Sequence, residues 1–430
     1  MKAKQTVFVD QFTNGVLDPE LDFAYTVKDG GHIVANTAPG CWGPMMTPEL
    51  KGGHEVTKPV YVENAEVGDA IAIYIEDIHV TSMATASGSD KPNEGSFGDD
   101  PFIDGTCPNC GTVNPETEIR GIGKESIYCK NCGKQFTPFT IDHGYTIAFD
   151  HHLQMGLTLD EENANKLAEN ANECANMPEN SIQNSIISQA PTDLVGVLAR
   201  MRPFLGQLGT TPSEAFPDSH NAGDFAQSLI GASHEFGKTE AALEHRTDGH
   251  MDINQVRQGA VLVAPVKVEG GGIYLGDMHA MQGNGEIAGH TTDVAGIVRL
   301  RVEVIKDAPL EGLVLFPVEE DLPYLAKPFS QEEKEKIKQL AKDWQGIEPE
   351  VSLPITFVGT GATLNEATDS GLNRASRLFE VPLGEILNRS TITGSIDVGR
   401  NPGVATVTFL APTSYLDKIG LLKIAERQYE

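Results

Sequence analysis

One glycine-rich run gathers the side chains best suited to chemistry. Residues 275–289 read LGDMHAMQGNGEIAG and place Asp277, His279, Gln282 and Glu286 between glycines. Glycine allows backbone conformations with positive φ and a close approach to a ligand, at an entropic cost that a structural loop rarely accepts so often. The run therefore predicts a functional site, for which the rest of the chain is scaffold, wall or insertion.

Two kinds of chemistry suit these residue types. Asp277 and His279 are two residues apart, so their side chains point to the same face if the backbone is extended. Together with Glu286 they could hold a catalytic zinc ion that keeps an open coordination position. The same groups could instead perform general acid–base catalysis without a metal. A hydrogen-bonded turn is the structural alternative, and the density of functional side chains favours a site.

Apolar segments on both sides of the run are predicted to be strands that position it. Residues 259–268 precede the run, and residues 297–305 follow it. From Val298 to Val304 apolar and charged side chains alternate, which is the period of a strand with one solvated face. The chain up to Val80 is also β-rich, whereas the composition from Ser87 to Asp104 predicts an exposed linker.

Three other segments have helical patterns: residues 160–177, 330–344 and 369–388. Ser330 is the expected N-cap of the second, and Pro382 is expected to bend or break the third. Residues 403–410 are predicted to form the last strand. We divide the chain into an N-terminal β-rich part (1–104), an inserted cysteine module (105–138), a continuation that carries the polar run (139–310) and a C-terminal α+β part (311–430).

Four of the six cysteines form two Cys-x-x-Cys pairs. Cys107 and Cys110 are separated by 18 residues from Cys129 and Cys132, and each pair ends in Cys-Gly. Four thiolates can close a tetrahedron around Zn²⁺ without an open position, so the spacing predicts a structural zinc ribbon. Two disulfides or a redox pair are the alternatives. We expect the module to stabilise a long loop or to form an oligomer contact, with nucleic-acid binding as the alternative.

The charge balance restricts the partners of the chain. Its 32 basic and 61 acidic residues give a formal net charge of −29, which disfavours binding to nucleic acid or to an anionic membrane. No apolar run approaches the ~20 residues needed to cross a bilayer. Paired metal-site cysteines are typical of a reducing compartment, so we expect a cytoplasmic protein.

The polar run resembles the signature of a known family. Residues 276–286 match the acetamidase/formamidase pattern Gly-Asp-x-His-Ala-x-Gln-Gly-x-Gly-Glu. Residues 249–252 resemble the family's Gly-Asn-Met-Asp segment, with His250 in place of the usual Asn, and residues 208–212 and 54–69 resemble two further blocks. The cysteine module departs from the family pattern, as does Lys58, which stands where a glycine is common.

The resemblance implies an amidase that hydrolyses the C–N bond of a short-chain, acetamide-like or formamide-like amide. It implies a mainly β fold of β-sandwich character with an α+β portion. It also implies a homodimer or a higher homo-oligomer. The departures weaken any transfer of substrate identity, and a family member that binds a small amide or sugar-like ligand without turnover is the second hypothesis.

The mechanism that follows assigns a role to each group. Asp277 and His279, with Asp252 or His54 as a further ligand, would hold a divalent metal that activates water and polarises the amide carbonyl. Glu286 would act as the general base. The remaining expected site residues are Gln282 in catalysis and Gly283, Gly285 and Thr210 in substrate binding. Cys41, in a glycine- and proline-rich loop, is an alternative nucleophile but fits a buried thiol better.

Overall fold

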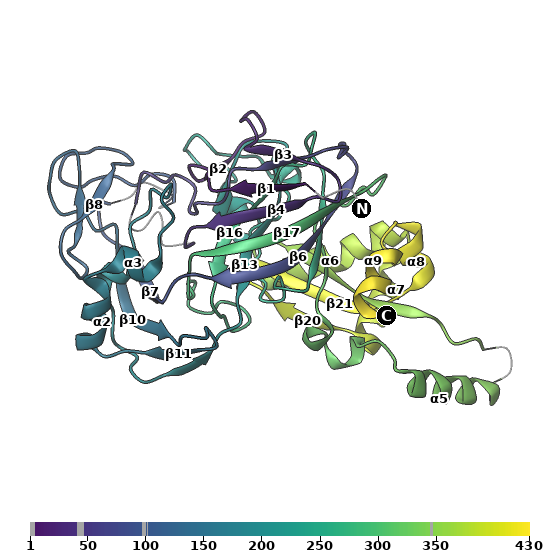
Figure 1. Cartoon of the computed structure of the whole chain (residues 1–430). Coiled ribbons are helices and arrows are strands. Elements are labelled where there is room, and N and C mark those ends of the chain that lie inside the picture. The colour runs from purple at the N-terminus through teal and green to yellow at the C-terminus, as the bar shows by residue number, and fades with distance from the viewer. Residues whose placement is uncertain (1–4, 41–46, 97–99, 101, 345–346) are drawn as a thin grey trace.

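The computed structural model describes residues 5–40, 47–96, 100, 102–344 and 347–430, and it is dominated by β-sheets (Figure 1). Cys41 lies outside the described residues. The largest sheet contains, in spatial order, β1 (Thr6–Val9), β4 (His32–Thr37), β17 (Gly296–Ile305), β6 (Ala70–Val80), β15 (Val261–Pro265), β18 (Val314–Phe316), β19 (Ser352–Thr360), β21 (Val404–Pro412) and β20 (Ser395–Val398). Its pairs are antiparallel except for β1 with β4.

A second sheet packs against one half of the first and carries the polar run. It contains β13 (Phe204–Thr210), β16 (Ile273–His279), β5 (Val60–Val62) and β3 (Tyr25–Val27). Leu275 and Met278 of β16 share one hydrophobic core with Val298 and Leu300 of β17. The inward side chains of β17 are buried and alternate with more exposed ones, as the sequence predicts. The two sheets therefore form a sandwich.

Helices cover the other half of the main sheet and form the α+β portion at the right of Figure 1. Phe379 packs there against Phe357 of β19 and Phe409 of β21, with ring centroids 5.7 and 6.4 Å away. The helices are α6 (Leu364–Phe379), α7 (Leu383–Thr393), α8 (Thr413–Lys418) and α9 (Leu422–Tyr429). The predicted helix over 369–388 is thus two helices, because α7 begins directly after Pro382.

A third sheet lies at the left of Figure 1 and contains β12 (Leu198–Arg200), β11 (Met155–Thr158), β10 (Phe139–Phe149) and β7 (Ala84–Pro92). β7 corrects the prediction of a linker from Ser87. Small and polar side chains suit this strand because Thr85, Ser87 and Gly88 are buried beneath neighbouring chain segments. The predicted helix over 160–177 is also two, α2 (Glu161–Ala168) and α3 (Ala171–Ala175), separated at Glu169 and Asn170.

Smaller elements complete the chain. The ribbon hairpin pairs β8 (Thr117–Ile119) with β9 (Ile127–Cys129), and β14 (Phe216–Pro217) pairs with β2 (Val16–Leu17). α4 (Gly223–Ser228) lies beside the site, and α5 (Gln331–Lys342) begins at the expected cap, Ser330, with a full capping box. Among the described helices, none has the length and apolar composition needed to span a bilayer.

Candidate active site

Asp277 and His279, two positions apart in the polar run, lie together at the end of β16. His279 Nε2 lies 3.0 Å from Asp277 Oδ1 and 3.3 Å from Asp293 Oδ1, and all three side chains are buried. β16 reaches this point because it pairs along its length with β13. The predicted proximity of the carboxylate and the imidazole is therefore present in the fold.

Three acidic residues of the site have left-handed backbone conformations. The φ angles are +52° at Asp252, +51° at Asp277 and +43° at Glu286. Such conformations cost a non-glycine residue about 1–3 kcal/mol and cluster at functional sites. Gly206 of β13 lies beneath two of these carboxylates, and a Cβ there would lie 2.5 Å from Asp252 Oδ1 and 2.6 Å from Asp277 Oδ2. The backbone is shaped to aim the carboxylates inward.

Two further histidines face Asp277. His250 Nδ1 donates to the carbonyl of Ser219 at 2.6 Å, which leaves Nε2 directed at carboxylates, 3.1 Å from Asp252 Oδ2 and 3.7 Å from Asp277 Oδ2. His54 Nε2 lies 3.8 Å from Asp277 Oδ1. A backbone carbonyl that fixes the tautomer and orientation of an imidazole is the usual support of a metal-ligating histidine.

These side chains form two groups of potential metal ligands, called donor sets below, and both groups include Asp277. One set is His54, His250 and Asp277, the other is Asp252, Asp277 and His279, and within each set the donor atoms lie within 4.8 Å of one another. Within the described residues, His54 Nε2 and Asp252 Oδ1 are buried without a hydrogen-bond partner. An imidazole nitrogen and a carboxylate oxygen that are buried without a partner can both act as ligands to a divalent cation, which would satisfy them.

The ionisation of the cluster follows from burial and mutual charge. Burial, with His250 adding to it, holds the pKa of His54 well below its usual range. Burial also raises the pKa of Asp277 to about 6, although His279 opposes the shift. The pKa of His279 is raised well above its usual range, because attraction to Asp277 outweighs the opposing effect of burial. The neutral imidazole of His54 is thus available as a ligand.

Glu286 lies in the same buried neighbourhood. Its side chain is 5% exposed, and its Oε2 atom has no hydrogen-bond partner among the described residues. Burial, followed by repulsion from Asp252, raises the pKa of Glu286 well above its usual range. A carboxyl group held in this way binds a proton more readily than an exposed glutamate does, as a group that accepts and returns a proton requires.

Arg400 completes the site from the C-terminal part of the chain. Its Nη1 atom donates to Asp252 Oδ2 at 2.5 Å, and the residue is 3% exposed. The backbone of Gly285 pairs with the segment around Arg400, with its N–H 3.2 Å from the carbonyl of Gly399. The polar run and a loop more than a hundred residues away are therefore joined directly.

Another ion cluster supports the loop that carries His250 and Asp252. Asp248 has a φ of +60° and is buried, and its carboxylate accepts from Arg246 at 2.6 Å and from Arg374 of α6 at 2.6 Å. Arg246 also donates to the Thr360 hydroxyl at 2.8 Å. The C-terminal part of the chain, through α6 and β19, thus anchors the loop that carries His250 and Asp252.

The charged groups open onto a cavity of about 270 Å³. The polar residues that line it are His54, Ser219, His250, Asp252, Asp277, Glu286, His290 and Arg400. The structure therefore brings five expected site residues together: Asp277, His279, Asp252, His54 and Glu286. These positions agree with a site, while the individual roles remain predictions.

The other expected contacts lie elsewhere. The Gln282 amide donates to the carbonyl of Asp252 at 2.8 Å, and the Thr210 hydroxyl donates to the carbonyl of Pro265 at 2.6 Å. Gly283 is exposed and Gly285 pairs with the Arg400 segment. None of the four is among the described residues that line the cavity. Their contribution in this structure is to hold loops, and substrate contact by them stays a prediction.

Several site residues were not anticipated from the sequence. His250 was noted only as a departure from the family segment, although a histidine two residues before Asp252 is a usable signal. No sequence motif around Arg400 or Asp293 indicates that these residues belong to a site. Ser219, His220 and Asp100 form a hydrogen-bonded row, with Ser219 Oγ 3.0 Å from His220 Nδ1 and His220 Nε2 2.9 Å from Asp100 Oδ2. The Ser219 hydroxyl also donates to the Gly52 carbonyl, so this row serves as support for the loop that orients His250.

The four paired cysteines converge at the ribbon hairpin. Their sulfur atoms all lie within 4.8 Å of one another, and the cysteines are free thiols. Each Cys-x-x-Cys pair is closed into a turn by a hydrogen bond from the glycine that follows it. The Gly111 N–H donates to the Cys107 carbonyl at 2.9 Å, and the Gly133 N–H donates to the Cys129 carbonyl at 2.8 Å. This arrangement could bind a metal ion and does not contain the two alternative disulfides.

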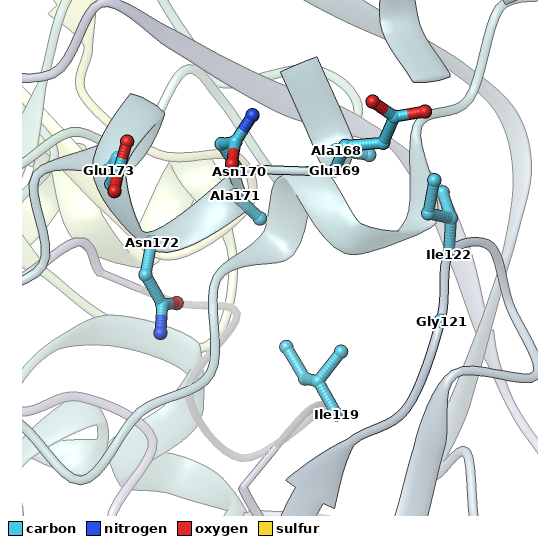
Figure 2. A pocket seen from close by; sticks show the side chains of 9 residues that line it. All are labelled: Ile119, Gly121, Ile122, Ala168, Glu169, Asn170, Ala171, Asn172 and Glu173. Atoms are coloured by element: carbon cyan, nitrogen blue, oxygen red, sulfur yellow. The ribbon is translucent and has the colours of Figure 1, made fainter. Parts of the chain in front are cut away.

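A hollow of about 590 Å³ lies between the ribbon and the turn from α2 to α3 (Figure 2). Figure 2 shows Ile119 and Ile122 on one side and residues of the turn on the other. The titratable side chains among its described lining residues are Glu169 and Glu173. The smaller cavity, with its converging acids and histidines, is therefore the better candidate for catalysis.

Comparisons with known proteins identify the family of the chain. The chain resembles in fold a predicted acetamidase/formamidase from Thermoanaerobacter tengcongensis (17% identity, 97% of this chain and 98% of that chain, TM-score 0.53). It also resembles acetamidases from Yersinia enterocolitica (16%, 96% and 94%, 0.54) and Bacillus halodurans (16%, 97% and 100%, 0.52). No curated protein matches the sequence. Residues 29–380 match the model of the Acetamidase/Formamidase family, so the chain belongs to that family and is a hydrolase of amide C–N bonds.

Proposed function

We propose that the chain hydrolyses a linear primary amide of the acetamide and formamide type to a carboxylate and ammonia. The observation that supports this most is the convergence of His54, Asp277 and Glu286 on one cavity in a member of an amidase family. His279 lies behind this lining, with its Nε2 atom 3.0 Å from Asp277 Oδ1. In the reaction, water adds its oxygen to the carbonyl carbon, the C–N bond breaks, and the amide nitrogen takes one proton of the water and leaves as ammonia. The carboxylic acid formed then releases the other proton, which ammonia accepts at neutral pH.

The same cluster is proposed to hold a divalent metal. Asp277 and His279 are the expected ligands, with Asp252, His54 and His250 available from the two donor sets. A bound cation of this kind polarises the amide carbonyl and lowers the pKa of water. Arg400 keeps Asp252 oriented toward the cluster through its hydrogen bond.

Glu286 is proposed to move the proton. Glu286 lines the cavity and its Oε2 atom has no hydrogen-bond partner among the described residues, so this carboxylate is available to accept a proton from the attacking water. Its burial favours the protonated form once the proton has arrived, so the same carboxyl group can pass the proton to the departing nitrogen. Asp277 and His279, whose Oδ1 and Nε2 atoms lie 3.0 Å apart in this structure, would hold the cation beside this carboxyl group.

Ammonia release from formamide and acetamide tests this function. We expect turnover by the metal-loaded protein, loss of turnover after dialysis against a chelator, and recovery when a divalent cation is returned. Unchanged turnover in a protein that retains only the metal of the cysteines would contradict the catalytic metal. Binding of amides without any ammonia release would support the non-catalytic hypothesis instead.

The four cysteines are proposed to hold a structural zinc ion. Four thiolates complete its tetrahedron and leave no position for water or substrate. Zinc in this place would fix the ribbon hairpin, in which Cys107, Cys129 and Phe136 form a small buried cluster. Its contribution would be to folding and not to the chemical step.

Homo-oligomeric assembly also remains a proposal. α5 projects away from the rest of the chain in Figure 1 and has no buried residue. Its apolar side chains Ile337 and Leu340, followed by Trp344, are exposed on one face. An amphipathic helix with an uncovered apolar stripe supports assembly with another chain. Cytoplasmic location and the absence of nucleic-acid partners stay predictions from composition.

A further inference from the structure

The cavity has an apolar wall that the hydrolysis of acetamide does not use. Phe102, Phe139, Phe225 and Pro92 line it together with the charged groups. Phe225 lies parallel to the ring of His250, with a centroid separation of 5.9 Å, and Phe102 meets Phe225 edge to face at 5.5 Å. The aromatic surface therefore begins directly beside a candidate metal ligand.

Phe139 is the most firmly supported part of this wall. It is 3% exposed and packs with Ala86, Ile127 and Ile186 in one buried cluster. It begins β10, where it pairs with Pro92 at the end of β7. Because Ile127 belongs to the ribbon hairpin, the cysteine module stands directly behind this wall.

The size of the cavity exceeds that of acetamide. Acetamide has four non-hydrogen atoms, which occupy about 120 Å³ if each takes the ~30 Å³ of a liquid water molecule. One attacking water adds another ~30 Å³. A cavity of about 270 Å³ therefore has space left for further atoms on the substrate even when a metal ion is counted.

The charge of the cavity restricts what those atoms can be. Asp252, Asp277 and Glu286 line it, and Arg400 already donates to Asp252. A carboxylate on the acyl group of the amide would be repelled by these acids. A polar group placed against the phenylalanine rings would lose its hydrogen bonds to water. An apolar acyl group avoids both penalties and buries surface against the rings.

We propose that the preferred substrate is a primary amide whose acyl group is apolar and larger than acetyl, and that Phe139 is a specificity-determining residue. This proposal rests on the proposed amide hydrolysis and narrows its substrate class. The acyl group lies against Phe139 and Phe102, while the amide lies between Glu286 and the Asp and His cluster.

A substrate panel with the full-length, metal-loaded protein tests the proposal. The panel contains acetamide, isobutyramide, benzamide and lactamide, and lactamide replaces one methyl group of isobutyramide with a hydroxyl. We expect kcat/KM for isobutyramide to exceed that for acetamide and for lactamide by about tenfold or more. Equal or better use of acetamide or lactamide overturns the proposal but leaves amide hydrolysis intact. Failure with every amide overturns both.

Variants locate the selectivity in the wall. Phe139→Ala is expected to lower the ratio of kcat/KM for isobutyramide to that for acetamide by about tenfold. Phe139→Leu, which keeps more of the buried volume, serves if the alanine variant does not fold, and is expected to lower the ratio less. The matched control is Ile141→Ala, since Ile141 packs on the same cluster but is not among the described lining residues. An unchanged ratio in the Phe139 variants, or an equal fall in the control, overturns the role of Phe139.

Discussion

Asp277 is the side chain on which both donor sets depend. Its Oδ1 atom faces His54 and His279, and its Oδ2 atom faces His250. Gly40 lies so close that a Cβ there would overlap Asp277 Oδ1. Contacts with three histidines and the close approach of Gly40 restrict the orientation of this carboxylate. A fixed orientation is what a ligand in a metal site with several ligands requires.

Glu286→Gln gives the sharpest residue-scale prediction. The amide keeps the size of the side chain but cannot take a proton from water, so we expect kcat to fall by about 10²–10⁴ with KM changed much less. Ammonia release at several substrate concentrations measures both constants. Glu173→Gln, at an exposed position of α3, is the control and should behave like the unmodified protein. Unchanged kcat in Glu286→Gln would remove this residue from proton transfer.

Single residues were predictable only where their neighbours along the chain signalled them. Asp277, His279 and Glu286 lie within one short run, so residue type and spacing identified them together. Arg400 contacts Asp252 across 148 positions of sequence, and His54 lies near Asp277 across 223 positions. Such contacts form when sheets and loops pack. His54 and Asp252 could be expected only because their segments resemble the family, and nothing in the sequence near Arg400 indicates its contact with Asp252.

At the scale of elements, the turn between β5 and β6 shows how one carboxylate joins two strands. Asp69 accepts from the Glu66 N–H at 2.9 Å, from the Asp307 N–H at 3.0 Å and from Lys306 Nζ at 2.7 Å. Burial opposes its ionisation, but these hydrogen bonds outweigh burial and hold the pKa of Asp69 below its usual range. The end of β17 is thereby tied to the start of β6.

This contact predicts a pH-dependent stability. A depressed folded-state pKa means that ionised Asp69 stabilises the fold above its unfolded pKa of about 3.9, and that the benefit is lost as the pH falls through the folded value. Asp69→Asn should therefore lower the free energy of unfolding at pH 6 to 7, and the gap to the unmodified protein should narrow below about pH 4. Urea unfolding across this range measures it. Asp77→Asn, at an exposed position of β6, should show no such gap.

Periodicity predicted the long strands well and the ends of helices less well. β17 alternates buried and exposed side chains, so its pattern is explicit in the sequence. Ser330 and Pro382 marked true helix starts because capping and proline act locally. β7 was missed, since its Ala, Thr, Ser and Gly composition resembles that of a loop until β10 covers it.

At the scale of the molecule, the ribbon and the cavity wall are one continuous structure. The cysteine cluster positions β9, Ile127 of β9 packs on Phe139, and Phe139 lines the cavity. The family signature indicated the sandwich and the site, but the cysteine module departs from that signature. Its position beside the active site therefore came only from the fold.

Removal of one cysteine tests the ribbon. Cys110→Ser should lower the zinc content by one ion per chain and lower the temperature of unfolding, because a structural zinc contributes its binding energy to folding. Metal analysis and thermal unfolding are the measurements. Cys174→Ser, in α3 and outside the cluster, should keep the zinc. Equal zinc content in the two variants would rule out the cysteine site.

The pairing of Pro92 with Phe139 has a consequence for how such a chain can change over generations. Directly paired residues on adjacent strands are separated by about 5 Å, so residues 93–138 leave the third sheet and return to it at nearly the same place. A short turn could bridge that gap without moving either strand. A lineage could therefore gain, lengthen or lose the whole excursion as one heritable unit. Each such event would remodel the substrate wall, and with it the contact of Asp100 with His220 that supports the loop orienting His250.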